Sequence, residues 1–173
     1  MPDALVVPGR LYGPGAPLLM YSGDVAEARG ATVHRHTWPV PPPADPGGVR
    51  DEVAAALDGL GGHPLLIAKS LGTYATGLAA ERELPAVWLT PLLTEPVVAA
   101  GLARATAPFL LVGGTADQYW DDGLAARLTP HVLRVDGADH GMYVPGPLTA
   151  SIAVLARVVV AVEDFLTEIA WPR

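Results

Sequence analysis

Six short apolar segments alternate along this chain with six longer segments that have the composition of helices. The predicted strands cover residues 4–7, 32–37, 65–68, 86–90, 109–112 and 131–135. The predicted helices cover residues 17–29, 48–60, 73–83, 95–103, 121–128 and 148–169. Strands that alternate with helices are typical of a parallel sheet. We therefore expect an α/β fold, with one domain over residues 1–173 and a mainly parallel sheet of about six strands.

The composition suits this architecture. A chain of 173 residues is long enough for one domain with a sizeable core. Half of the residues are hydrophobic and only 6% are aromatic, so the core is expected to consist largely of Ala, Val and Leu. Such a core fits a sheet that is covered on both faces. The last predicted helix has an apolar stripe that we expect to face the sheet, at Ile152, Leu155, Val159, Val162, Leu166 and Ile169.

Charge and residue content argue against several classes of partner. A net charge of −7 disfavours nucleic acid, which selects basic surfaces. Because cysteine is absent, there are no disulfides or thiolate metal sites. The start of the chain does not resemble a signal peptide, and the apolar run 152–162 is too short to span a membrane. We expect a cytoplasmic protein without a cofactor, and its single lysine against ten arginines indicates a GC-rich bacterial genome.

The strongest chemical motif follows the third predicted strand. Ser70 stands between two small residues, Ala68 and Gly72, at the point where the strand passes into a helix. A serine in such a tight turn is aimed outward by the backbone, which a nucleophilic hydroxyl requires. The alternative is an ordinary serine at a helix start, where serine is also favoured.

Two further strand ends carry the residues that a nucleophilic serine needs. Asp117 ends a Gly-rich turn after the fifth strand, and His140 lies in the turn after the sixth. A catalytic serine needs an imidazole to take its proton and a carboxylate to orient that imidazole. The order Ser70, Asp117, His140 and the placement of each residue at a strand end favour such a triad.

These motifs resemble those of small α/β-hydrolases. Ala-Lys-Ser-Leu-Gly and Gly-Ala-Asp-His are similar to motifs of the compact dienelactone-hydrolase-like branch, and the resemblance spans residues 4–169. It implies a compact three-layer fold without a lid domain. It also implies a serine hydrolase that cleaves a small ester or thioester through an acyl-enzyme, with Ser70 as nucleophile, Asp117 as orienting acid and His140 as base.

The same resemblance implies an oxyanion hole. The backbone N–H of Leu71 and that of Arg10 would hold the oxyanion, with Leu11 as the second choice for the latter. Pro8-Gly9 stands where many relatives have His-Gly, and dienelactone hydrolases proper use cysteine as nucleophile. Side chains near the predicted strand ends are candidates to contact the substrate: Tyr12, Trp38, Tyr119 and Met142.

Other residues offer competing interpretations. His34 and His36 alternate on one strand and would face one side, which suits a metal or, more simply, a polar edge strand. Gly9, Gly13 and Gly15 imitate a dinucleotide-binding loop but lack its spacing.

Alternatives also exist within the proposed site. Asp121, Asp122 and Asp139 are rival carboxylates; we expect the first two to begin a helix and the third to shape its own loop. For Lys69 we expect an ion pair beneath the turn, with Asp139 or Asp117, rather than a Ser-Lys dyad. A hydrolase-like fold that binds a ligand or partner without turnover is the competing function.

Overall fold

The computed structural model describes residues 1–172 and arranges the strands in one sheet. Their order is β2-β1-β3-β4-β5-β6, and every neighbouring pair is parallel. The strands are β1 (Asp3–Val7), β2 (Thr32–Arg35), β3 (Leu65–Lys69), β4 (Ala86–Leu89), β5 (Phe109–Gly114) and β6 (Val132–Val135). The predicted parallel sheet of about six strands is confirmed.

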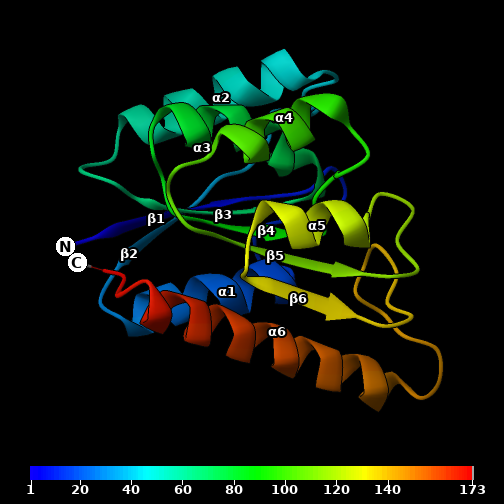
Figure 1. Cartoon of the computed structure of the whole chain (residues 1–173). Coiled ribbons are helices and arrows are strands. Elements are labelled where there is room, and N and C mark those ends of the chain that lie inside the picture. The colour runs from blue at the N-terminus through cyan, green and yellow to red at the C-terminus, as the bar shows by residue number, and fades with distance from the viewer. Residues whose placement is uncertain (173) are drawn as a thin grey trace.

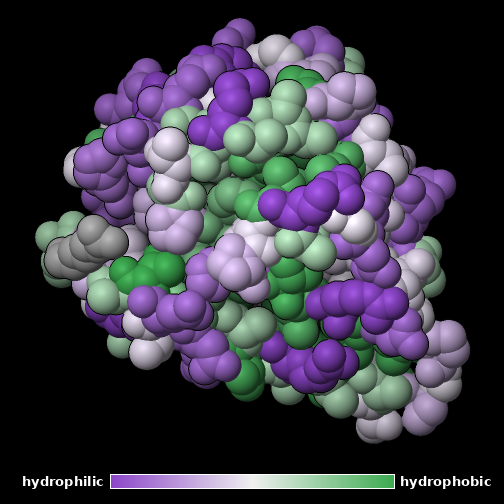
Figure 2. Space-filling view, viewed as in Figure 1, coloured by the Kyte–Doolittle hydropathy of each residue, from purple (hydrophilic) through white to green (hydrophobic). Residues whose placement is uncertain are grey.

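Helices cover both faces of the sheet, which makes three layers (Figure 1). One face carries α2 (Pro46–Asp58), α3 (Thr76–Glu81), α4 (Pro96–Arg104) and α5 (Asp122–Leu128). The other face carries α1 (Pro17–Ala28) and α6 (Leu148–Glu168). Hydrophilic side chains dominate the upper edge of the space-filling view, over α2 (Figure 2). In residues 1–172, no helix is both long and apolar enough to cross a membrane.

The core is divided by the sheet into two clusters. Successive residues of a strand point to opposite faces, so Leu65 and Ile67 of β3 pack toward α1 and α6. Leu66 and Ala68 pack on the other face, among residues from α2 to α5. All four side chains are fully buried. A strand buried on both faces has no polar alternation, which explains why β3 appears in the sequence as a continuous apolar run.

The expected apolar stripe of α6 is partly wrong. Ile152 is 56% exposed, whereas Val154, Val158 and Phe165 are buried against the sheet. The helix is apolar on nearly all sides over its first half, so the spacing of apolar residues is consistent with more than one orientation. Only Val162 and Leu166 of the expected stripe are fully buried.

The helix expected over residues 73–83 begins differently. A 3-10 segment, η1 (Ser70–Ala75), follows β3 directly, and the α-helix starts only at Thr76. The hydroxyl of Thr73 donates to the Ser70 carbonyl at 2.6 Å, which closes this tight first turn. The tight turn keeps Ser70 at the very end of the strand.

A packing prediction concerns Gly101, where α4 crosses α3. A Cβ at this position would lie 2.5 Å from the Gly77 backbone nitrogen and would also collide with the Thr76 side chain. Because backbone must move, we expect Gly101→Ala to lower the free energy of unfolding by roughly 2 kcal/mol. The helical control is Gly123→Ala, which meets only the flexible end of Arg127 and the Asp121 carboxylate, at 3.3 and 3.5 Å. Urea denaturation of both variants tests this; equal stabilities would contradict it.

Candidate active site

Ser70 occupies a strained turn at the carboxyl end of β3. Its φ is +50°, a conformation that side chains other than glycine rarely adopt. Gly72 allows the close approach behind it, since a Cβ there would lie 2.8 Å from Val7 Cγ1 and 3.1 Å from the Pro8 carbonyl oxygen. The close approach therefore requires a small residue at position 72, as the sequence motif predicts.

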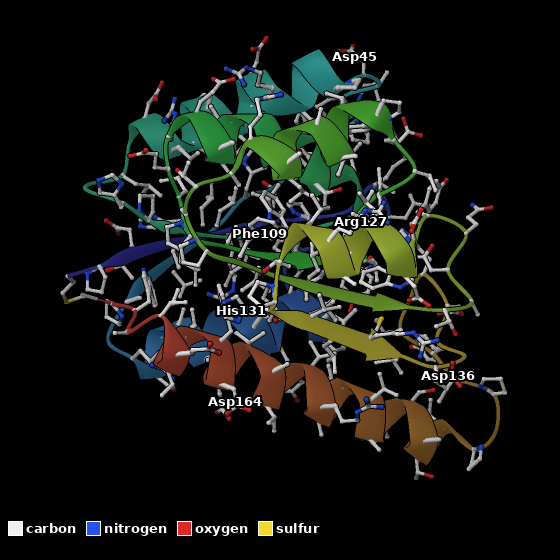
Figure 3. All side chains as sticks on the ribbon, in the orientation of Figure 1. Asp45, Phe109, Arg127, His131, Asp136 and Asp164 are labelled. Atoms are coloured by element: carbon white, nitrogen blue, oxygen red, sulfur yellow. The ribbon has the colours of Figure 1, made fainter. Side chains whose placement is uncertain are left out.

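The turns that carry Asp117 and His140 are joined by backbone contacts. The N–H of Ala116 donates to the Ala138 carbonyl at 3.0 Å. A side chain on Gly114 would overlap the backbone of Ala138, so the glycine permits this approach. Figure 3 labels His131 and Asp136 near the two ends of β6, and the candidate site lies at the Asp136 end. All three candidate residues thus follow carboxyl ends of parallel strands.

A continuous hydrogen-bond chain connects the three side chains. His140 Nδ1 lies 2.7 Å from Asp117 Oδ2, and His140 Nε2 lies 2.8 Å from Ser70 Oγ. The side chain of Asp117 is fully buried, and its other oxygen accepts the Tyr119 N–H at 2.9 Å. A carboxylate only accepts, so Nδ1 carries the imidazole proton and Nε2 is free to accept the serine hydroxyl. This arrangement can activate a nucleophile.

The three rival carboxylates make other contacts. Asp121 caps α5 by accepting the Leu124 N–H at 2.8 Å, and Asp122 pairs with Arg134 at 2.9 Å. Asp139 accepts backbone N–H groups within its own loop, from Gly141 at 2.8 Å and from Tyr143 at 3.0 Å. None of these three carboxylates hydrogen-bonds to His140, whose Nδ1 lies beside Asp117.

The loop after β1 approaches Ser70, and hydrogen bonds from Trp38 hold this loop in place. A Cβ on Gly9 would lie 3.5 Å from the Ser70 Cβ. Trp38 Nε1 donates to the carbonyls of Pro8 and Gly9, at 3.2 and 3.1 Å. In a trans peptide the N–H points opposite to the carbonyl, so the Arg10 N–H points away from Trp38. Leu71 is at the start of η1, where N–H groups have no acceptor within the helix.

An open pocket of about 630 Å³ lies over Ser70. Two of the expected substrate residues, Tyr12 and Tyr119, line it, as do Arg10, Leu11 and Leu71. Sequence reasoning missed further lining residues, which lie a few positions after the carboxyl ends of β3 to β6: Tyr74, Leu92, Gln118 and Gly141. Their position just after a strand is the signal that could have identified them.

Trp38 and Met142 were expected to contact the substrate, and the structure places both elsewhere. Met142 is only 3% exposed and belongs to the core under α1 and α6. Trp38 packs edge-on against His36 and anchors the loop after β1. Aromatic or large side chains near a strand end thus serve the core and the loops as well as the pocket.

Lys69 does not form the expected ion pair. In the described chain no carboxylate lies within 4 Å of its ammonium, which donates to Thr90 Oγ1 at 2.8 Å and to the His140 carbonyl at 2.9 Å. Burial lowers the pKa of Lys69 to about 8, against the opposing effect of Asp117 and Asp139. Ser70 Oγ is bonded to His140, so the contacts do not form a Ser-Lys dyad.

The two alternating histidines lie near different carboxylates, and Nε2 of His36 has no hydrogen-bond partner among the described residues. His34 Nε2 lies 2.8 Å from Asp3, and His36 Nε2 lies 3.9 Å from Glu52. Burial lowers the pKa of His36. Among residues 1–172, no group of three or more His, Cys, Asp or Glu side chains is placed to hold a metal ion.

A larger hollow of about 850 Å³ lies at the opposite, amino-terminal edge of the sheet. It is lined by residues such as Pro2, His63, Pro108 and Trp171. It contains no serine, and its one histidine has no carboxylate partner among the described contacts. Despite its size, it lacks the chemistry that the smaller pocket brings together.

The carboxylate assignment gives a testable difference between neighbours. Asp117→Asn keeps the side-chain shape but removes the charge that orients His140, so we expect kcat for p-nitrophenyl acetate to fall by roughly 10⁴. Asp139→Asn is the matched control, because an amide oxygen can still accept from Gly141 and Tyr143. Its kcat should change by less than about tenfold. Equal losses in the two variants would show that the acid is misassigned.

Comparisons with known proteins agree on the fold alone. No protein-family model and no curated protein matches the chain. Among solved structures, α/β-hydrolase domain-containing protein 10 from mouse has 14% identity and a TM-score of 0.71, over 98% of this chain and 91% of the mouse chain.

Two bacterial structures are similar to the same extent. XC6422 from Xanthomonas campestris, a serine hydrolase without a lid, has 16% identity and a TM-score of 0.71, over 96% of this chain and 81% of its own. Est1E from Butyrivibrio proteoclasticus, bound to ferulic acid, has 14% identity and a TM-score of 0.75, over 98% and 90%. With its six parallel strands and flanking helices, the chain has the α/β-hydrolase fold.

Proposed function

We propose that this protein is a serine hydrolase that cleaves a small ester or thioester through an acyl-enzyme. The observation that carries the proposal is the hydrogen-bond chain from Ser70 through His140 to Asp117, with bonds of 2.8 and 2.7 Å. A buried carboxylate, an oriented imidazole and a strained, outward-facing serine are the parts that covalent acyl transfer requires.

The mechanism follows from these contacts. His140 takes the hydroxyl proton as Ser70 Oγ attacks the acyl carbon, and Asp117 stabilises the imidazolium. The backbone N–H groups of Leu71 and Arg10 hold the developing oxyanion, with Leu11 as the alternative to Arg10. His140 then protonates the leaving group. Water, deprotonated by the same imidazole, releases the acyl group and restores Ser70.

The shape of the site supports a small substrate. The connection from β4 to α4 covers only residues 90–95, so nothing long folds over the pocket from this position. Tyr12 and Tyr119 supply apolar surface beside Ser70 for an acyl or aryl group. Est1E, which has a similar fold, binds ferulic acid, a small aromatic acid.

Several finer points stay predictions from the sequence. These are the dienelactone-hydrolase-like branch, the single domain over residues 1–173, the cytoplasmic location, the bacterial origin and the absence of a cofactor. Binding without turnover remains the competing function, and the following experiment distinguishes the two.

Removal of the nucleophile tests the proposal. We expect the wild-type chain to hydrolyse p-nitrophenyl acetate, and Ser70→Ala to lower kcat by roughly 10⁵ or more. Ser22→Ala is the matched control, since this buried serine only donates to the Leu18 carbonyl within α1. It should retain wild-type kcat. Equal rates for the wild type and Ser70→Ala would favour the binding function.

Acyl-chain length tests the small-substrate proposal. In an open pocket, methylene groups beyond the first few remain in water and add little binding energy. We therefore expect kcat/KM for p-nitrophenyl palmitate to be no higher than that for the acetate and the butyrate. A clear preference for the long chain would contradict an open, short-chain site.

A further inference from the structure

A buried lysine that forms no ion pair among residues 1–172 lies directly beside the nucleophile. Lys69 is the only lysine in the chain, and it is 2% exposed. Its Nζ donates to Thr90 Oγ1 and to the His140 carbonyl. The Tyr12 ring lies 4.8 Å from Nζ. Burying an ammonium among neutral groups costs free energy of folding. A lysine that is buried despite this cost is a candidate for a functional role.

The His140 contact suggests that role. The ring of His140 is held at both nitrogens by Ser70 and Asp117, while its backbone carbonyl is held from below by Lys69. Lys69 and Ser70 are adjacent in the chain. One side chain therefore connects the strand that carries the nucleophile to the loop that carries the base.

We propose that Lys69 is a positioning residue, whose ammonium fixes the loop of His140 so that Nε2 stays within reach of Ser70. This inference rests on the proposed function, and it extends that function to a residue whose ammonium contacts Thr90, the His140 carbonyl and the Tyr12 ring rather than the Ser70 hydroxyl. The hydrogen bond is charge-assisted, which makes it stronger than a bond from a neutral donor.

The charge of Lys69 makes the bond pH-dependent. Burial lowers the pKa of Lys69 to about 8, while the carboxylates of Asp117 and Asp139 act in the opposite direction. The other titratable groups that face it are His140 and Tyr12, and burial raises the pKa of the Tyr12 hydroxyl above its usual value. As the pH rises through about 8, Lys69 loses its charge and holds the His140 carbonyl less strongly. Activity should therefore decline on the alkaline side.

The first experiment replaces the donor. Lys69→Met keeps the length and apolar stem but cannot donate, so we expect kcat for p-nitrophenyl acetate at pH 7 to fall by roughly 10- to 100-fold. KM should change by less than about threefold, because Met has nearly the size of Lys and the aromatic lining from Tyr12 and Tyr119 is unchanged. The alkaline decline of kcat/KM should disappear in this variant. Thr129→Val is the control, since it removes a buried side-chain bond to the Phe109 carbonyl at the opposite edge of the sheet.

The second experiment measures the pKa of Lys69 directly. Because the chain has one lysine, ¹⁵N-lysine labelling yields one Nζ signal, and its NMR titration should give the pKa that limits activity. Thr90→Val keeps the branched shape but removes one acceptor of the ammonium. It should shift both the NMR titration and the alkaline decline to lower pH, by roughly one unit. This variant also tests the inference if Lys69→Met does not fold.

The outcomes separate the two proposals. The inference is overturned if the alkaline decline persists in Lys69→Met, if that variant keeps wild-type kcat, or if the NMR titration and the alkaline decline differ in the wild type. If the wild type is active, any of these results overturns the role of Lys69 and leaves the proposed function unaffected. A wild type no faster than Ser70→Ala would overturn the proposed function and this inference with it.

Discussion

Parallel pairing of the strands is the constraint on which the candidate site depends. All five strand pairs are parallel, so β3, β5 and β6 end at the same edge of the sheet. Residues separated by 70 positions, Ser70 and His140, are thereby brought within 2.8 Å. The triad is not built by local sequence; it results from the direction in which buried strands pair.

The site depends on close approaches between backbone segments and on two local features that cost free energy of folding. Gly72 and Gly114 let neighbouring loops approach where a side chain would collide. Ser70 is held in a rare backbone conformation, and the buried ammonium of Lys69 donates only to neutral oxygens within the part of the chain that the structure describes. Such features persist only where the surrounding structure is stable enough to hold them. Here that structure is a fully buried β3 with core clusters on both faces.

The sheet and the triad were predictable because each depends on a sequence pattern that can be recognised without knowledge of tertiary contacts. Strand ends and turn glycines are local signals, and the order Ser70, Asp117, His140 is visible along the chain before any contact is known. The orientation of α6 was not predictable in this way, because its first half is apolar on nearly all sides and packing alone selects the buried face. Likewise Trp38 and Met142 lie near strand ends in the sequence, yet tertiary contacts direct Trp38 to the loop after β1 and Met142 into the core. The partners of Lys69 come from β4 and the His140 loop, which no spacing rule connects to residue 69.

The most direct test of the account is whether Ser70 is an activated nucleophile. The wild-type protein would be treated with a fluorophosphonate probe, which reacts with activated serines, and the labelled residue located by peptide mass spectrometry. The account predicts one label, on Ser70, and no labelling of Ser70→Ala. An unlabelled wild type, or a label on another serine, would contradict it.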